Sequence, residues 1–471
     1  MKKGKNHILE GPLWKSLLFL SVPIILANLL QTAYQLTDMF WVGRLGADAV
    51  AAISISFPLM FLILSLGGGL VMAGTILVAQ YKGKNDKKAT DHVASQTLLM
   101  AFFVAVTLAI IGYSLSPLLI SLMGAEPNVF TSAVSYLRIS FIGVIFIFGY
   151  MIYQSLMRGI GEVKIPLYLV LISVLLNLVF DPLFIFGWGF IPAMGVSGAA
   201  IATILCQGFA ALIGMFMLFS GKYGIHIKKE NLKPDFKLIS KMFRLGLPSS
   251  IEQSTRAIGL TLMTFLVARF GTEIIASYGI GSRILSLVII PALGISIANS
   301  TLVGQNLGAK NIKRAEKSTN LSLIIGFLAL TVIGVIFFIF AEQIATLFIP
   351  GDQQVIKMSS FFLRIVALTF GFISLFQVSN SAFRAAGNTV VPMTISIASL
   401  FVFQFPVAYV LAFHTSLAET GIWISFPVSY VLSGIVALIW LSKGSWKNKK
   451  LTEEIKLAEK AETEFIIEEG I

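Results

Sequence analysis

Long apolar stretches separated by short polar connections dominate the chain. Each is close to the ~20 residues that an α-helix needs to cross the hydrocarbon core of a bilayer. None shows the apolar–polar alternation of a transmembrane strand. Because lipid cannot satisfy free backbone groups, helices are expected. We predict an all-α polytopic membrane protein with twelve transmembrane helices, near 16–40, 49–80, 93–113, 131–153, 166–186, 197–219, 242–268, 276–304, 318–340, 360–383, 392–412 and 422–442.

Composition and charge placement agree with this pattern. Hydrophobic residues make up 56% of the chain and charged residues 12%, about half the charged share of a soluble domain. Of the 35 basic residues, 28 lie near the termini or in the even-numbered loops, five lie toward the other face, and Arg256 and Arg283 lie deeper in apolar runs. The positive-inside rule therefore predicts a multi-pass protein of the cell (cytoplasmic) membrane with both termini cytoplasmic. The net charge of +12 then reflects topology, and no nucleic-acid partner is expected.

The two halves of the chain resemble each other. VGRLG at 42–46 matches VARFG at 267–271, and YLRI at 136–139 matches FLRI at 362–365. The offset of 225 to 226 residues contains six spans, so both halves run in the same direction, as in many transporters. We predict two six-helix bundles related by a parallel internal repeat. The predicted parts are an N-terminal bundle (1–219), a basic cytoplasmic linker (220–241), a C-terminal bundle (242–442) and a cytoplasmic tail (443–471).

Three acidic residues, Asp38, Asp181 and Glu252, fall inside apolar runs. Charges inside a bilayer are costly and point by default to function. The repeat places Met263 at the position equivalent to Asp38, and Val407 at the position equivalent to Asp181. The fold therefore accommodates apolar residues there, and Asp38 and Asp181 are not needed to build the bundle.

Helical spacing groups further polar residues with these acids. Asn177 and Asp181 are four residues apart and share one helical face, as do Tyr34 and Asp38. Thr203 lies at a similar depth, early in the sixth span. We therefore predict a polar pocket of these five residues in the outer half of the N-terminal bundle. A straight first helix would rise about 35 Å before Asp38, which leaves open a position at the outer interface for this acid.

Other polar positions allow two readings. Pro23 removes a helical hydrogen bond from the first span. This residue is either a kink that serves packing or a hinge that moves. Glu252 and Arg256, four residues apart, form either a structural ion pair or a second ion or substrate site.

Two motifs together resemble the multidrug and toxic compound extrusion (MATE) family. DMFWVGRLGADAVAA at 38–52 is similar to its first-to-second helix signature. NLVFDP at 177–182 and GVSGAAIAT at 195–203 are similar to its fifth-to-sixth helix signature. The clustering of polar residues in the first bundle is closer to the DinF-like prokaryotic branch. Glu252 lies earlier in its helix than the C-terminal acid of the NorM-like branch, which argues against a NorM-type second site.

The resemblance implies a secondary antiporter that exports cationic or amphipathic small molecules in exchange for H⁺ or Na⁺. It implies a cation site at Asp38, Asn177, Asp181 and Thr203, with Tyr34 and Pro23 as the adjoining network and hinge. The coupling ion would be H⁺ or Na⁺, with no other metal and no cofactor. The expected partners are small-molecule substrates and the lipid bilayer, and the protein is expected to be a monomer.

The same residues bear on alternative functions. A lipid-linked precursor flippase of a related superfamily branch remains the alternative, although only Arg256 and Arg283 are basic and deep. No HExxH, GxSxG or phosphate-binding glycine loop is present, so the chain is not expected to be an enzyme. GGG at 67–69 lies within a span and predicts close helix packing. Four scattered histidines and the single Cys206 predict neither a metal centre nor an intrachain disulfide.

Overall fold

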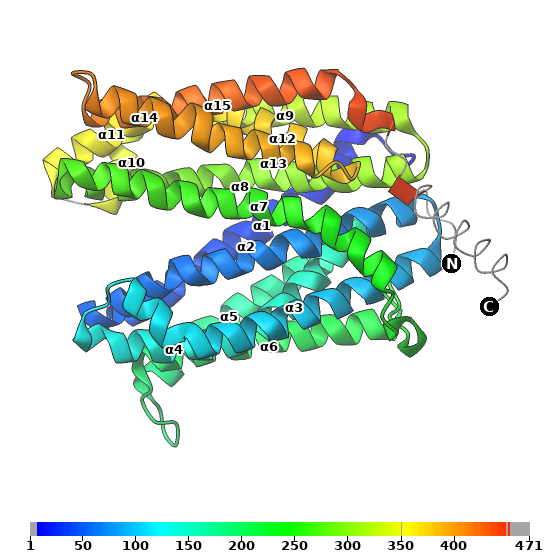
Figure 1. Ribbon diagram of the computed structural model, residues 1–471, viewed down its shortest axis with the longest axis horizontal. Helices are drawn as coiled ribbons and strands as arrows, with labels where there is room; N and C mark the ends of the chain where they lie inside the picture. The colour runs from blue at the N-terminus through cyan, green and yellow to red at the C-terminus, as the bar shows by residue number, and fades with distance from the viewer. Residues whose placement is uncertain (1–6, 350, 449–450, 453–471) are drawn as a thin grey trace. The chain divides into compact units, whose positions relative to one another are not determined.

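The structure is a computed structural model that describes residues 7–349, 351–448 and 451–452, and its regular elements are helices (Figure 1). Most of the predicted tail, from residue 453 on, lies outside the described residues. The helices are α1 (Leu13–Gly43), α2 (Ala47–Gly83), α3 (Lys87–Leu122), α4 (Pro127–Ile160), α5 (Lys164–Phe186), α6 (Gly195–Ser220), η1 (Lys229–Leu232), α7 (Phe236–Val267), η2 (Ala268–Phe270), α8 (Thr272–Gly308), α9 (Ile312–Ile339), α10 (Ala341–Phe348), α11 (Gln353–Ala367), α12 (Phe370–Ala385), α13 (Val390–Ala398), η3 (Ser399–Gln404), α14 (Phe405–Phe413), α15 (Glu419–Ser442) and η4 (Ser445–Asn448).

Eleven of the twelve predicted spans are apolar enough to cross a bilayer within the described chain. Ten are continuous spans. One more, predicted at 360–383, is the pair α11 and α12, which bends by 52° at its break. The remaining predicted span is α7. At 32 residues α7 is long enough, but residues 249–256 within it are mostly polar or charged and lower its hydropathy. The predicted all-α, twelve-helix membrane fold is confirmed.

The eleventh predicted span is irregular in its middle. It starts as α13, widens into the π-helical turn η3, and continues as α14, which together form one 24-residue span. Pro406 lies at the start of α14 and has no backbone N–H to donate. A wider turn just before a proline is a common way to accommodate the missing hydrogen bond.

The chain divides into two compact units. The N-terminal unit comprises Val22–Thr75 and Asp91–Leu260. The C-terminal unit comprises the described parts of Met1–Ser21, Ile76–Thr90 and Thr261–Ile471. Four helices (α1, α2, α3 and α7) contribute residues to both units. The bundle boundaries at 219 and 242 stay a prediction.

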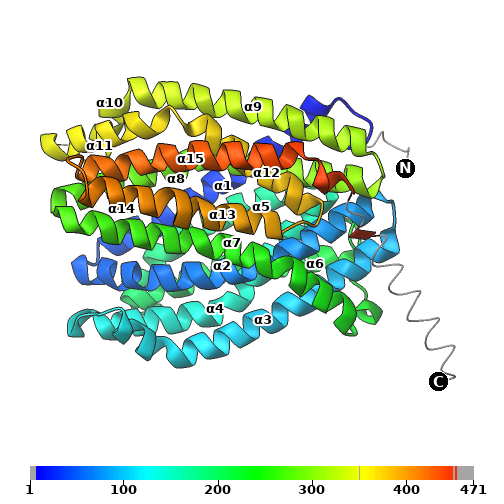
Figure 2. The same cartoon turned by 45° about the horizontal axis from the view of Figure 1, so that its top comes forward.

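Each unit has its own apolar core. In the N-terminal unit α6 packs along α4 and α5, and Phe141 and Phe148 of α4 are fully buried in that core (Figure 1). In the C-terminal unit α12 lies alongside α8, α9 and α15, and α14 lies alongside α15 (Figure 2). The N-terminal core therefore holds α4 to α6 as a rigid frame around the polar residues predicted there.

The three glycines at 67–69 are packing positions, as predicted. A Cβ atom at Gly67 would lie 1.8 Å from the Phe148 ring of α4, and one at Gly69 would lie 2.1 Å from the backbone nitrogen of Ser250 in α7. The Ser250 hydroxyl also donates a 2.5 Å hydrogen bond to the Leu66 carbonyl. Glycine is thus required where α2 meets α4 and α7.

Candidate functional site: a buried carboxylate cluster in the N-terminal unit

The centre of the site is one turn of α5. Asn177 and Asp181 are both fully buried, and the Asn177 amide nitrogen donates a 2.8 Å hydrogen bond to Asp181 Oδ1. The spacing of four residues places the two side chains on the same face of the helix, as predicted. α5 itself is fixed against α6 along most of its length, so this face has a defined position.

α1 and α6 supply the other two members of the cluster. The same Asn177 amide nitrogen donates a second hydrogen bond, of 2.9 Å, to Asp38 Oδ1. The Thr203 hydroxyl donates to Asp38 Oδ2 over 3.3 Å. Three helices that are far apart in sequence thus converge on two carboxylates. Asp38 is partly buried within this cluster and makes contact with α5 and α6.

Among the described residues, no basic side chain compensates the negative charge of the cluster. Neither Asp38 nor Asp181 forms a salt bridge with any described residue. Two carboxylates that share one amide donor repel each other, and burial removes the water that would screen them. The arrangement therefore favours uptake of a small cation.

Three oxygen atoms of the site have unused acceptor capacity. Asn177 Oδ1, Asp181 Oδ2 and the Tyr34 hydroxyl are buried and have no hydrogen-bond partner among the described residues. Buried polar atoms are nearly always satisfied, by protein, water or an ion. Carboxylate, amide and hydroxyl oxygens are the donors that hard cations prefer, and a carboxylate oxygen also accepts a proton. The donor set therefore fits Na⁺ or H⁺.

Tyr34 and Pro23 lie on the same helix as Asp38. Tyr34 is buried, one turn before Asp38, and its hydroxyl lies close to Thr203. Pro23 lies within α1, which continues as one helix across it from Leu13 to Gly43. Tyr34 is thus a neighbour of the cluster, whereas Pro23 is four turns away along α1.

Two neighbours of the cluster were not predicted. The Tyr136 side chain on α4 and the Cys206 side chain on α6 both lie within electrostatic range of Asp38 and Asp181. Tyr136 could have been found by the comparison that singled out the acids, because its repeat partner is Phe362 and the pair differs by one hydroxyl. Cys206 lies one turn after Thr203 and carries no comparable signal.

The C-terminal half places apolar side chains at the equivalent positions. Met263 and Phe362, the repeat partners of Asp38 and Tyr136, are buried in one apolar cluster. In this cluster Phe362 packs 4.7 Å from Trp423, and Tyr278 stacks on Trp423 at 6.1 Å. The polar cluster is therefore a property of one half of the repeat.

Glu252 and Arg256 lie on α7 within the N-terminal unit. Glu252 is buried, Arg256 is partly buried, and each takes part in at least one polar or electrostatic interaction. Their role as a second site stays a prediction. No group of three or more His, Cys, Asp or Glu side chains that could hold a metal ion occurs among the described residues.

The sequence is similar to known membrane transporters along most of its length. The profile of the MatE family matches residues 23–183 and 248–410, one stretch in each half of the repeat. The chain is 30% identical to the probable multidrug resistance protein YoeA of Bacillus subtilis, over 97% of this chain and 98% of that one. It is 25% identical to an FAD transporter of Shewanella oneidensis, over 92% and 95% of the two chains.

The fold is similarly matched. A solved structure of a multidrug resistance MATE family transporter, described as its outward-facing conformation, superposes with a TM-score of 0.88. The two sequences are 27% identical, and the match covers 96% of this chain and all of the other.

Proposed function

Because the chain belongs to the MatE family of membrane transporters, we propose that it is an antiporter that exports small cationic or amphipathic molecules in exchange for H⁺ or Na⁺. Members of this family are transporters and not enzymes, and the chain is a multi-pass membrane protein. The finer proposal is supported by one observation above all. Two carboxylates from different helices share a single amide donor, and neither is paired with a basic side chain of the described residues.

The residues of the cluster have different tasks in this proposal. Asp38 and Asp181 carry the negative charge that binds the ion. Asn177 uses both amide hydrogens to hold the two carboxylates together, which leaves its own Oδ1 free as a ligand. Thr203 fixes the second oxygen of Asp38.

Ion binding would change how the helices fit. When the ion is absent, repulsion between the carboxylates favours separation of α1 from α5. A bound proton or Na⁺ removes this repulsion and favours the close arrangement. An ion that binds one arrangement better shifts the population toward it, and a substrate that favours the other arrangement is then exchanged for the ion.

The substrate class is supported by relatives and not by a contact in this chain. YoeA is named as a probable multidrug resistance protein, which favours drug-like cations, whereas the Shewanella relative is named as an FAD transporter and FAD is an anion. We propose drug-like cations as the principal cargo. FAD belongs in the test as the competing cargo.

Efflux from proteoliposomes tests the proposal. Purified protein is reconstituted with a cationic dye, or with FAD, and an inward pH gradient or an inward Na⁺ gradient is imposed separately. Dye efflux driven by one gradient and absent without it supports antiport and identifies the ion. Efflux that is indifferent to both gradients would contradict the proposal.

Two variants connect transport to the cluster. Asp38→Asn should reduce ion-driven efflux by about tenfold or more, because a carboxylate in a medium of low dielectric constant should contribute more than about 1.4 kcal/mol to the free energy of ion binding. The matched control is Asp48→Asn, which removes an exposed carboxylate in the first turn of α2. Wild-type efflux by Asp38→Asn, at wild-type levels of folded protein in the membrane, would remove Asp38 from the mechanism.

A further inference from the structure

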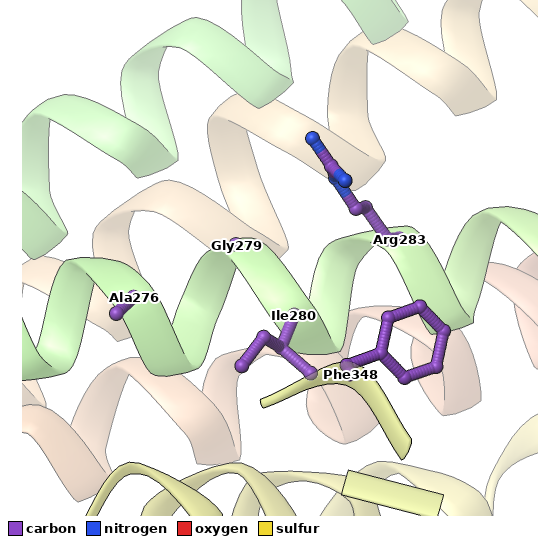
Figure 3. Close-up of a pocket in the computed structure, with 5 residues that line it drawn as sticks. All are labelled: Ala276, Gly279, Ile280, Arg283 and Phe348. Atoms are coloured by element: carbon purple, nitrogen blue, oxygen red, sulfur yellow. The ribbon is translucent and has the colours of Figure 1, made fainter. Parts of the chain in front are cut away.

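A shallow pocket of about 240 Å³ lies on α8 in the C-terminal unit, next to the end of α10 (Figure 3). Four of its residues, Ala276, Gly279, Ile280 and Arg283, follow the spacing i, i+3, i+4 and i+7 and form one face of α8. Phe348 of α10 lines the other side. The pocket is thus an apolar surface that carries a single charge.

The charge of Arg283 is not satisfied within the described chain. Arg283 is exposed and has no hydrogen bond, ion pair or aromatic contact with a described residue. Glu273 is the only acidic residue of α8, and its carboxylate accepts a hydrogen bond from Gln354. A cation within a membrane-spanning helix is expected to have a partner.

Two arginines that are predicted to lie toward the outer face, Arg44 and Arg269, are placed differently. Arg44 lies 4.7 Å over the Phe40 ring, and Arg269 lies 5.8 Å over the Phe265 ring. These guanidinium groups are held by aromatic neighbours. Arg283 instead borders an open pocket, which indicates a ligand that carries negative charge.

The depth of the pocket favours a lipid. α8 has 37 residues and is about 55 Å long, well beyond the ~30 Å of the hydrocarbon core. Arg283 lies about three turns from its N-terminal end, so its long side chain reaches the boundary between headgroups and hydrocarbon. In the orientation predicted from the basic residues, this is the outer leaflet.

The size of the pocket favours a headgroup over a drug. Its volume is below the roughly 300 Å³ at which drug-sized sites begin. Gly279 leaves part of this space open, because a Cβ atom built there would meet no atom within 4 Å. Packing of the helix does not require glycine at this position.

We propose that this face of α8 binds the headgroup of an anionic phospholipid of the outer leaflet. The phosphate pairs with the Arg283 guanidinium, and the glycerol lies over Gly279 against Phe348. The lipid would thereby attach to the C-terminal unit, separate from the carboxylate cluster of the N-terminal unit. This proposal does not depend on which ion or cargo the protein transports.

Lipid binding to the full chain tests it. The purified protein is titrated in neutral detergent with phosphatidylglycerol or with phosphatidylcholine, and binding is followed by native mass spectrometry and by thermal unfolding. We expect phosphatidylglycerol to bind about tenfold more tightly and to raise the unfolding temperature. Inorganic phosphate should not replace it, because one guanidinium without apolar contacts binds free phosphate weakly. Equal binding of the two lipids, or equal stabilisation by phosphate, would overturn the proposal.

Three variants locate the site. Arg283→Gln removes the charge, and Gly279→Leu fills the pocket from a position where a Cβ atom meets nothing within 4 Å; both should abolish the preference for phosphatidylglycerol. Arg269→Gln removes a basic side chain outside the pocket and should leave the preference unchanged. Retention of the preference by both pocket variants contradicts the proposal. So does a loss of transport of an anionic cargo by Arg283→Gln in liposomes of phosphatidylcholine alone, because Arg283 would then serve the cargo.

Discussion

The Asn177 amide nitrogen donates to two carboxylates at once, over 2.9 and 2.8 Å. This single side chain therefore determines how closely the two carboxylates approach each other in a cluster that has no basic partner within the described part of the chain. A hydrogen bond to a charged group contributes about 1.5–3 kcal/mol, so two of them offset part of the cost of burying the pair. These hydrogen bonds hold the two acidic side chains together, which is the basis of the proposed cation site.

Tyr136 gives the first prediction at this scale. Its hydroxyl lies within electrostatic range of Asp38 and Asp181, on a helix that carries none of the predicted site residues. Tyr136→Phe should weaken the apparent affinity for the coupling ion by about two- to tenfold, as expected when one dipole of about 0.5–1.5 kcal/mol is lost. The measurement is the ion concentration at half-maximal efflux.

The control for Tyr136 is a tyrosine far from the cluster. Tyr168 lies on α5 but is 60% exposed, so Tyr168→Phe should leave the ion dependence unchanged. If both variants leave the ion concentration at half-maximal efflux unchanged, Tyr136 is only a packing residue.

The residues of the cluster were predictable because the chain contains its own comparison. An acid whose repeat partner is Met263 or Val407 is not required by the fold, and helical spacing then grouped Asn177 with Asp181. The hydrogen bonds from Asn177 and Thr203 to Asp38 were not predictable in detail. They depend on how α1, α5 and α6 are rotated, which long-range packing determines and local spacing does not.

At the scale of helices, α2 and α8 approach each other closely within the C-terminal unit. A Cβ atom at Gly83 would lie 1.9 Å from the Gln305 carbonyl oxygen, and one at Gly308 would lie 1.9 Å from the Gln80 carbonyl oxygen. These four residues are two repeat-related pairs, so each helix presents the same glycine to the same carbonyl of its counterpart. The contact is symmetric and leaves no room for a side chain.

This contact predicts the effect of adding one methyl group. Gly83→Ala or Gly308→Ala should each destabilise the protein by about 1–3 kcal/mol, because backbone atoms must move to accept the new Cβ. Thermal unfolding of the solubilised protein measures this loss. Gly43→Ala is the control, since a Cβ atom there meets nothing within 4 Å, and it should leave the unfolding temperature unchanged. An unchanged unfolding temperature in Gly83→Ala would mean that the two helices have more room than the geometry shows.

The linker before α7 is attached to α3 by side-chain hydrogen bonds. His92 contacts Asp235 over 3.1 Å, and the Gln96 amide donates to the carbonyl oxygens of Asn231 and Lys233 over 2.9 and 2.7 Å. Asp235 also accepts a hydrogen bond from the Leu238 N–H and caps the start of α7. This attachment determines where α7 begins.

The attachment should depend on pH through Asp235. Partial burial alone would raise the pKa of Asp235, but the Leu238 N–H and His92 together hold this pKa below its ordinary value of 3.8. A lowered pKa in the folded state stabilises the protein above the ordinary pKa, and this contribution is lost as the pH falls through the folded value. The difference in unfolding temperature between wild type and Asp235→Asn should therefore shrink as the pH falls below the ordinary pKa of Asp235. A difference that grows on acidification would contradict this account.

Helix boundaries show where sequence reasoning reached its limit. Residues 360–383 were predicted as one span, yet the chain bends by 52° between α11 and α12. No proline lies at Leu368 or Thr369, where the break occurs, so the local sequence gives little warning. Gly371 lies just after the break, and apolar periodicity contains no information about the angle.

At the scale of the whole chain, the two halves share one architecture but differ in the polar side chains that they carry. One half has a carboxylate cluster, and the other half has an apolar cluster at the equivalent positions. The proposed ion site therefore lies in one half of a fold that is otherwise repeated. Sequence comparison of the halves could predict this asymmetry because the matched motifs fix an offset of 225 to 226 residues between equivalent positions.

The distribution of basic residues predicts the orientation of the chain in the membrane. Because the chain has a single cysteine, this orientation can be measured by cysteine labelling. Cys206 is fully buried, so the wild-type protein should not react with a membrane-impermeant thiol reagent. Lys222→Cys lies in the linker and Thr415→Cys lies in the exposed loop after α14. Because 28 basic residues lie on the linker's side and five on the other, Lys222→Cys should react only in inside-out vesicles and Thr415→Cys only in intact cells. The reverse labelling would place both termini outside the cell and would contradict the predicted orientation, on which the proposed direction of export depends.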